Sequence, residues 1–239
     1  MSKFQDAEIT WLGHASFQII SPEGKVVLID PWLNENPSAP YGADQIEQAD
    51  IIALTHGHFD HIGDTVELAK RTGAKVICIF EISQFLGDQG VSEEQIIGMN
   101  IGGTVEAEGI KFTMVHAIHS SGVPGESGIV DGGDPAGFVI RFENGFTVYD
   151  TGDTDFFGDM EYIGEFHHPD LMLTCIGDHF TMGPKTAARS IELVKPNYVI
   201  PMHYGTFPVL TGTPEELKNN LPEVMKDTVL TAEIGTPMS

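Results

Sequence analysis

Thr55-His56-Gly57-His58-Phe59-Asp60-His61 is the most informative stretch of the sequence. Three histidines and one aspartate lie between positions 56 and 61, directly after the apolar residues 51–54. A loop can turn consecutive side chains toward one point, whereas a helix or strand sends neighbours to different faces, and Gly57 lets the backbone bend. Imidazole nitrogen and carboxylate oxygen together suit zinc, iron, manganese or nickel. The stretch therefore predicts a metal site, and its apolar flanks argue against a solvated histidine-rich turn.

The spacing suggests two metal positions, with His56 and His58 at one and Asp60 and His61 at the other. Further candidate ligands follow predicted strands elsewhere in the chain. They are His119 after residues 112–118, Asp153 after residues 146–149 and His203 after residues 198–200. One such histidine alone is more often structural, but several at strand ends favour ligation, because α/β sheets bind ligands beyond the carboxyl ends of their strands.

Apolar runs typical of strands alternate with helical patterns in both halves, which predicts one α/β domain over residues 1–239. Strands are expected at residues 9–12, 17–20, 25–30, 51–54, 76–80, 110–119, 137–141, 146–150, 171–176 and 198–200. Helices are expected after Asp64, around residues 82–87, from Pro184 and from the capping box that begins at Thr213. Residues 119–137 are rich in glycine and proline and predict a loop.

Composition limits the classes of partner. Twelve Lys and Arg against 35 Asp and Glu give a formal net charge of −23, which repels nucleic acid and anionic membranes. The sequence has neither an apolar run long enough to span a bilayer nor a signal-peptide pattern, so we expect a cytoplasmic protein that acts on a small molecule. Whether it forms a homo-oligomer is left open. Cys78 and Cys175 lie in apolar runs and are expected to be buried thiols.

The histidine stretch matches the H-x-H-x-D-H motif of the metallo-β-lactamase superfamily. Further motifs, which extend the likeness over nearly the whole chain, resemble the branch of metal-dependent hydrolases related to ascorbate-6-phosphate lactonase. These motifs are Trp11-Leu12-Gly13-His14-Ala15, Leu28-Ile29-Asp30-Pro31-Trp32, Met99-Asn100-Ile101-Gly102-Gly103, Gly177-Asp178-His179-Phe180-Thr181-Met182 and Pro201-Met202-His203-Tyr204-Gly205-Thr206-Phe207.

This resemblance implies an αββα sandwich, with two facing sheets flanked by helices and the site at one edge. It also implies a ligand set: His56, His58 and His119 for the first metal, Asp60, His61 and His203 for the second, and Asp153 as the bridge between them. His116 competes with His119, and we favour His119 because the ligand of the family stands before a small or aromatic residue, here Ser120.

Departures from the motif exclude some relatives. Position 153 holds Asp where thiolate-using zinc β-lactamases have Cys, and position 58 holds His where the diiron flavoprotein group has Glu. The superfamily nucleases carry an inserted domain and a basic surface, and this sequence shows neither.

The expected reaction is hydrolysis of a lactone or ester by a hydroxide that bridges two divalent metal ions, with zinc as first choice and manganese, iron or nickel as alternatives. Asp60 is expected to accept a proton, and His179 to stabilise the oxyanion. A phosphodiester or organophosphate is the second choice, although basic residues near the proposed site are few: Arg141, Lys185 and Arg189. The third alternative is a protein that binds a metal or a small ligand without catalysing a reaction.

Several residues keep two interpretations. Asp30 is either a strand-end turn residue or an acceptor that orients a ligating imidazole. His14 either lines the cleft or supports a ligand, or is structural, and we favour the structural interpretation. Tyr204 either offers its hydroxyl to the substrate or packs beside His203, and we slightly favour packing. His179 itself is either catalytic or a structural histidine. The glycine-rich residues 121–137 form either a lid or an ordinary surface loop.

Overall fold

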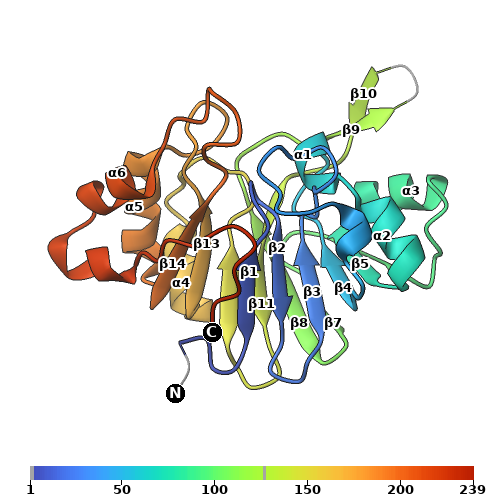
Figure 1. Ribbon diagram of the computed structural model, residues 1–239, viewed down its shortest axis with the longest axis horizontal. Coiled ribbons are helices and arrows are strands. Elements are labelled where there is room, and N and C mark those ends of the chain that lie inside the picture. The colour runs from blue at the N-terminus through green and yellow to red at the C-terminus, as the bar shows by residue number, and fades with distance from the viewer. Residues whose placement is uncertain (1–2, 126–127) are drawn as a thin grey trace.

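The computed structural model describes residues 3–125 and 128–239, and its core is formed by two six-stranded sheets (Figure 1). In spatial order the first sheet contains β1 (Glu8–Trp11), β2 (Phe17–Ile20), β3 (Val26–Ile29), β4 (Ile51–Ala53), β5 (Lys75–Ile79) and β6 (Ile96–Met99). The second contains β14 (Tyr198–Met202), β13 (Leu171–Cys175), β12 (Thr147–Asp150), β11 (Ala136–Arg141), β8 (Ile110–His116) and β7 (Thr104–Ala107).

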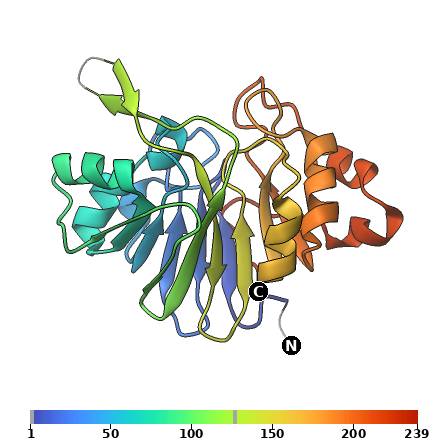
Figure 2. The same cartoon turned by 180° about the vertical axis from the view of Figure 1, so that it is seen from behind.

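Helices cover the outer faces of this sandwich. On the side of the first sheet lie α2 (Thr65–Thr72) and α3 (Phe80–Asp88), and on the side of the second lie α4 (Met160–His167), α5 (Pro184–Val194) and α6 (Pro214–Asn220). Seen from behind, the same helices flank the strands at the two ends of the molecule (Figure 2). The expected αββα class is confirmed. Short helices complete the chain: α1 (Phe59–Ile62) and the 3-10 turns Ala43–Gln45 and Glu223–Thr228.

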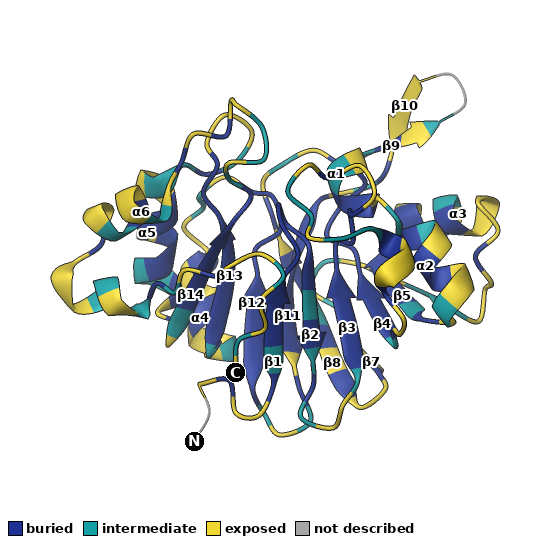
Figure 3. Ribbon diagram, viewed as in Figure 1, coloured by how far each residue is buried: buried dark blue, intermediate teal, exposed yellow. Residues whose placement is uncertain are grey.

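Burial explains why these strands form. Strands β3, β4, β12 and β13 are buried at every position and pair in parallel with at least one neighbour (Figure 3), as expected for continuous apolar runs covered on both faces. The main apolar core fills the space between the sheets, and a second core lies between the second sheet and its helices. Cys78 and Cys175 are buried free thiols, as expected, and burial raises their pKa values to about 12 and about 11.

The strand directions bring distant chain segments to one edge. Strands β3, β4 and β5 run parallel in one sheet, and β12, β13 and β14 run parallel in the other. Strand β1 shares the direction of β3, and β8 shares that of β12, because each is related to it by two successive antiparallel pairings. The residues that follow these strands therefore emerge at the same edge of the sandwich.

The structure differs from the sequence-based expectations in three regions. Residues 119–137 were expected to form a loop, but β9 (Gly122–Gly125) and β10 (Gly128–Asp131) form a hairpin that projects from the body (Figures 1 and 3). Strands β6 and β7 and helix α4 were not expected.

Within the described residues, no helix combines the length and apolarity needed to cross a bilayer.

Candidate metal centre

Three imidazoles converge at the carboxyl end of β4 and β8. Nε2 of His56 lies 2.9 Å from Nδ1 of His58, and Nε2 of His119 lies 3.3 Å from the same atom. Nitrogens that share a tetrahedral zinc at 2.0–2.1 Å are separated by about 3.3 Å, so the three atoms are spaced like ligands of one metal. His116, the competing candidate, is exposed at the end of β8, and its ring packs against Phe157.

Neighbouring hydroxyls hold the first two rings. The hydroxyl of Thr55 lies 3.0 Å from Nδ1 of His56, and that of Ser120 lies 3.2 Å from Nε2 of His58. Each contact uses the nitrogen that faces away from the cluster, and so fixes the ring with its other nitrogen turned inward.

A second cluster lies beside the first. It joins Asp60 and His61 to His203 and His14, and one ligand-type atom from each lies within 4.8 Å of the others. The carboxylate of Asp30 lies 2.7 Å from Nδ1 of His61, which leaves Nε2 of that ring directed into the cluster. Asp30 therefore contacts a candidate ligand, as one of its two interpretations required.

Asp153 lies between the two clusters. Its Oδ2 is 3.0 Å from Nε2 of His203, 3.2 Å from Nε2 of His61 and 3.6 Å from Nε2 of His119. Its Oδ1 is buried and has no hydrogen-bond partner among the described residues. A buried carboxylate oxygen without a partner is costly, and a cation at this position would compensate for it.

Burial keeps the first cluster neutral. The pKa of His56 lies well below its usual value because the ring is desolvated and lies near His61. Desolvation also lowers the pKa values of His58 and His119. Neutral imidazoles offer a free nitrogen lone pair, which metal binding requires.

The second cluster carries charge instead. Burial acts to lower the pKa of His61, but the carboxylates of Asp153 and Asp30 outweigh it and raise that pKa well above its usual value. Burial acts to raise the pKa of Asp60, but the hydrogen bond from His14 helps to hold it at about 2. Neighbouring histidines likewise overcome burial and hold the pKa of Asp153 well below its usual range. The ionised carboxylates, the neutral imidazoles of the first cluster and the unpartnered buried oxygen form a donor set that fits divalent metal ions. A metal ion bound to Nε2 of His61 would take the place of the proton there.

The local backbone of the motif differs from a simple loop. His58 precedes α1, so Asp60 and His61 lie on a single helical turn, while His56 and Gly57 lie in the preceding loop. Gly57 was expected to provide a bend, which remains a prediction. The structure adds a second reason for glycine, because a Cβ there would lie 2.4 Å from Cγ1 of Val123 in the projecting hairpin.

Two other candidates have different surroundings. His179 is exposed on the loop that follows β13, where its ring packs on Phe180 with centroids 4.4 Å apart, so the described contacts do not join it to the histidine clusters. Tyr204 stacks on Trp11 with ring centroids 5.3 Å apart, so it has a packing role, although the ring partner is Trp11 and not the expected His203. For His14 the sequence left support of a ligand open but favoured a structural role, although the residue follows a strand in the same way as the candidate ligands. That position was the available signal.

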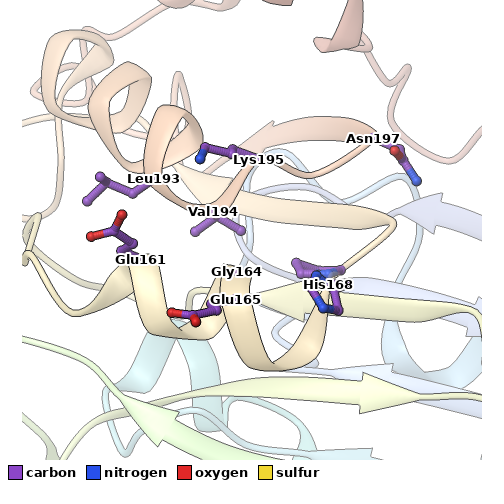
Figure 4. Close-up of a pocket in the computed structure, with 9 residues that line it drawn as sticks. Glu161, Gly164, Glu165, His168, Leu193, Val194, Lys195 and Asn197 are labelled. Atoms are coloured by element: carbon purple, nitrogen blue, oxygen red, sulfur yellow. The ribbon is translucent and has the colours of Figure 1, made fainter.

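A separate hollow lies where α4 and α5 end (Figure 4). Glu161 and Glu165 from α4 line it together with Lys195. Its lining residues Pro169 and Asn197 precede β13 and β14, whereas the candidate ligands follow the carboxyl ends of strands, so the hollow is no part of the candidate metal centre.

Comparison with known proteins shows the family of the chain. Residues 25–204 match the family described as the beta-lactamase superfamily domain. A UPF0173 metal-dependent hydrolase from Roseiflexus sp. is 49% identical over 217 residues, covering 90% of this chain and 89% of the relative. A UPF0173 metal-dependent hydrolase from Methanosarcina mazei is 50% identical over 213 residues, covering 89% of this chain and 90% of the relative. The solved structure of Igni18, a metallo hydrolase from Ignicoccus hospitalis, has a TM-score of 0.86 at 35% identity and covers 97% of both chains.

The fold and the clustered histidines therefore define a metal-dependent hydrolase of the metallo-β-lactamase superfamily. Within that superfamily, the chain belongs with the UPF0173 metal-dependent hydrolases.

Proposed function

We propose that this chain hydrolyses a lactone or ester with two divalent metal ions. The observation that carries the proposal is the position of Asp153, whose Oδ2 contacts nitrogens from both histidine clusters. In this proposal Asp153 would serve both metals. His56, His58 and His119 would hold the first, and Asp60, His61 and His203 would hold the second.

The donor set favours zinc, with manganese, iron or nickel as alternatives, because imidazole and carboxylate groups serve all four metals. Metals of this kind, when bound, would lower the pKa of a water molecule and so supply a nucleophile for a carbonyl carbon near neutral pH. The protein's own contribution is to hold the ligands in place and to move protons.

Asp60 was expected to act both as a ligand and as a proton acceptor. Its pKa of about 2 means that the carboxylate is ionised and binds a proton weakly. We therefore assign it mainly to metal binding, with proton acceptance as a secondary role.

His179 is the proposed donor to the developing oxyanion. Strand β13 lies between β12 and β14, so the loop that carries His179 leaves the sheet between the strands that precede Asp153 and His203. Its exposure leaves the ring accessible to a substrate.

The positions of the basic residues favour a carbonyl substrate over a phosphodiester. Arg141 ends β11, whose first residue, Ala136, lies at the site edge, so the arginine is roughly 17 Å away along the strand. Arg189 pairs with Glu192, and Lys185 lines a surface hollow that also contains Asp178. Phosphate recognition normally uses such cations beside the reacting group. None of Arg141, Lys185 and Arg189 is shown beside the histidine clusters, so a carbonyl substrate is favoured.

The proposal is tested with the purified chain, first stripped by a chelator and then reloaded with zinc, manganese, iron or nickel. Each form is assayed on simple lactones, aryl esters and an aryl phosphodiester. We expect metal-dependent turnover of lactones or esters that His58→Ala abolishes and His116→Ala retains, since His116 lies outside both clusters. Turnover of the phosphodiester alone would favour the second substrate class. No turnover by the metal-loaded chain would favour a metal-binding protein.

A further inference from the structure

His14 connects the two sheets beside the second cluster. It follows β1 in the first sheet, is fully buried, and has a left-handed backbone with φ of 54°. Its Nε2 lies 3.2 Å from Oδ2 of Asp60, and its Nδ1 lies 3.0 Å from the hydroxyl of Thr206. The ring also packs on His203, with centroids 4.0 Å apart. A single side chain thus contacts two candidate ligands of the second metal.

The chemistry of the Asp60 contact determines where one hydrogen lies. A ligating carboxylate can only accept hydrogen bonds, so Nε2 of His14 must carry a hydrogen and donate it to Asp60. The hydroxyl of Thr206 can either donate to Nδ1 or accept from it, so Nε2 remains the donor whichever charge the ring carries. A protonated Nε2 has no lone pair for a metal, so His14 orients Asp60 and is not itself a ligand, although it lies within ligand distance of the cluster.

The backbone of His14 acts on the other candidate ligand. Its carbonyl oxygen accepts a hydrogen bond of 2.9 Å from the backbone N–H of His203, and another of 2.9 Å from Nε1 of Trp11. The left-handed conformation allows the carbonyl and the ring to serve different partners, with the carbonyl bonded to His203 and the ring to Asp60. Neighbouring Gly13 also has a positive φ, and a Cβ there would lie 2.9 Å from the backbone oxygen of Ser38.

We propose that His14 is a positioning residue of the second metal position, and that it fixes Asp60 through its side chain and His203 through its carbonyl. The inference rests on the proposed two-metal function, because it assigns Asp60 and His203 to one metal. Outer partners of metal ligands change metal affinity about 10- to 100-fold when they are removed. His14 is therefore expected to control the affinity of the second metal and to leave that of the first unchanged.

The test is a stepwise titration of metal-free protein with zinc against a competing chelator, repeated with cobalt so that absorption reports the coordination of each site. His14→Ala is expected to weaken the second equivalent about 10- to 100-fold and to leave the first as in the wild type. His14→Gln places an amide N–H near the position of Nε2–H, so it is expected to restore most of the loss. Thr206→Val releases the ring from its other partner and is expected to weaken the second equivalent less than His14→Ala does.

The controls separate the possible failures. His116→Ala changes an exposed histidine outside both clusters and is expected to bind both equivalents normally. Circular dichroism checks folding, and if His14→Ala fails to fold, His14→Gln and Thr206→Val decide the outcome. Wild-type affinity for two equivalents in His14→Ala, or in Thr206→Val when His14→Ala does not fold, would overturn the positioning role.

Two further outcomes would also overturn the proposal. A folded His14→Gln variant that loses the second metal and its cobalt spectrum would show that His14 is a ligand. A wild-type chain that takes up a single equivalent would overturn the two-metal function, and the assignment of His14 with it.

Discussion

Asp30 and His61 meet at the edge of the first sheet, with Oδ2 of the carboxylate 2.7 Å from Nδ1 of the ring. The same carboxylate accepts hydrogen bonds from the backbone N–H and the hydroxyl of Thr55. Asp30 thus ties the start of the histidine motif to one of its last residues, and it keeps Nε2 of His61 directed at Asp153.

Replacing Asp30 with asparagine should weaken binding at the second metal position. Asn lacks the negative charge that makes the His61 imidazole a more basic metal ligand. Loss of such outer partners costs about 10- to 100-fold in metal affinity. Zinc titration of metal-free Asp30→Asn measures the effect. The matched control is Asp155→Asn, because Asp155 is exposed in the loop near Asp153. Equal zinc affinities for the two variants and the wild type would contradict the prediction.

Replacing Asp153 with alanine should remove metal from both positions, because its carboxylate contacts nitrogens from both clusters. His58→Ala should lose mainly the first metal, since His58 contacts His56 and His119. Elemental analysis of proteins purified without added metal gives the metal content of each. Unchanged content in both variants would rule out the two-metal assignment.

Asp150 should make the stability of the metal-free protein depend on pH. Burial and the nearby charge of Asp30 raise its pKa from 3.8 to about 8. Between these values the folded chain keeps a proton that the unfolded chain releases, so the free energy of unfolding falls as pH rises from about 4 to about 8. Asp150 is expected to lower the free energy of unfolding by on the order of a few kcal/mol across this pH range.

Asp150→Asn tests this dependence, because the amide mimics the neutral acid and can still accept the hydrogen bond from the backbone N–H of Gly152. Urea unfolding of chelated protein at about pH 5.5 and about pH 8.5 should show a smaller pH effect in the variant than in the wild type. Parallel pH profiles of the two proteins would show that Asp150 is ionised in the fold.

Gly177→Ala should destabilise the protein by about 1–3 kcal/mol. A Cβ at this position would lie 2.0 Å from the carbonyl oxygen of His203, and backbone cannot move aside as a flexible side chain can. The displaced His203 should also lower affinity for the second metal. Gly158→Ala is the control, since a Cβ there meets nothing within 4 Å. Thermal unfolding and zinc titration check both effects, and equal melting temperatures for the two variants would contradict the prediction.

Much of the fold could be predicted, because strands that are buried in a parallel sheet have continuous apolar sequences. The capping box was predicted as well, and the side chain of Thr213 accepts a hydrogen bond from the backbone N–H of Glu216. Helix α4 was missed because it contains Gly164, which disfavours a helix on its own. The structure explains this glycine by close packing, since a Cβ there would lie 2.4 Å from the carbonyl oxygen of Val194 in α5.

Strands β7 and β9 were also missed, because their local sequences do not favour a strand. Strand β7 has mainly exposed or half-exposed residues and lacks an apolar run. Strand β9 contains two glycines and a proline, which locally favour a loop, and it becomes a strand only by pairing with β10. A single domain over residues 1–239 and a cytoplasmic location remain predictions from the sequence.

The sequence alone determined which side chains can bind metal, because His56, His58, Asp60 and His61 are close along the chain and their spacing is local. It also indicated that further candidates stand at strand ends. Only the tertiary structure decided which of these meet. Asp60, His14 and Thr206 are joined by hydrogen bonds across separations of 46 and 192 residues, and such contacts exist only because two sheets pack with their strand ends at one edge. Local sequence patterns do not specify that packing, so the contacts of His14 with Asp60 and Thr206 could be identified only in the folded chain.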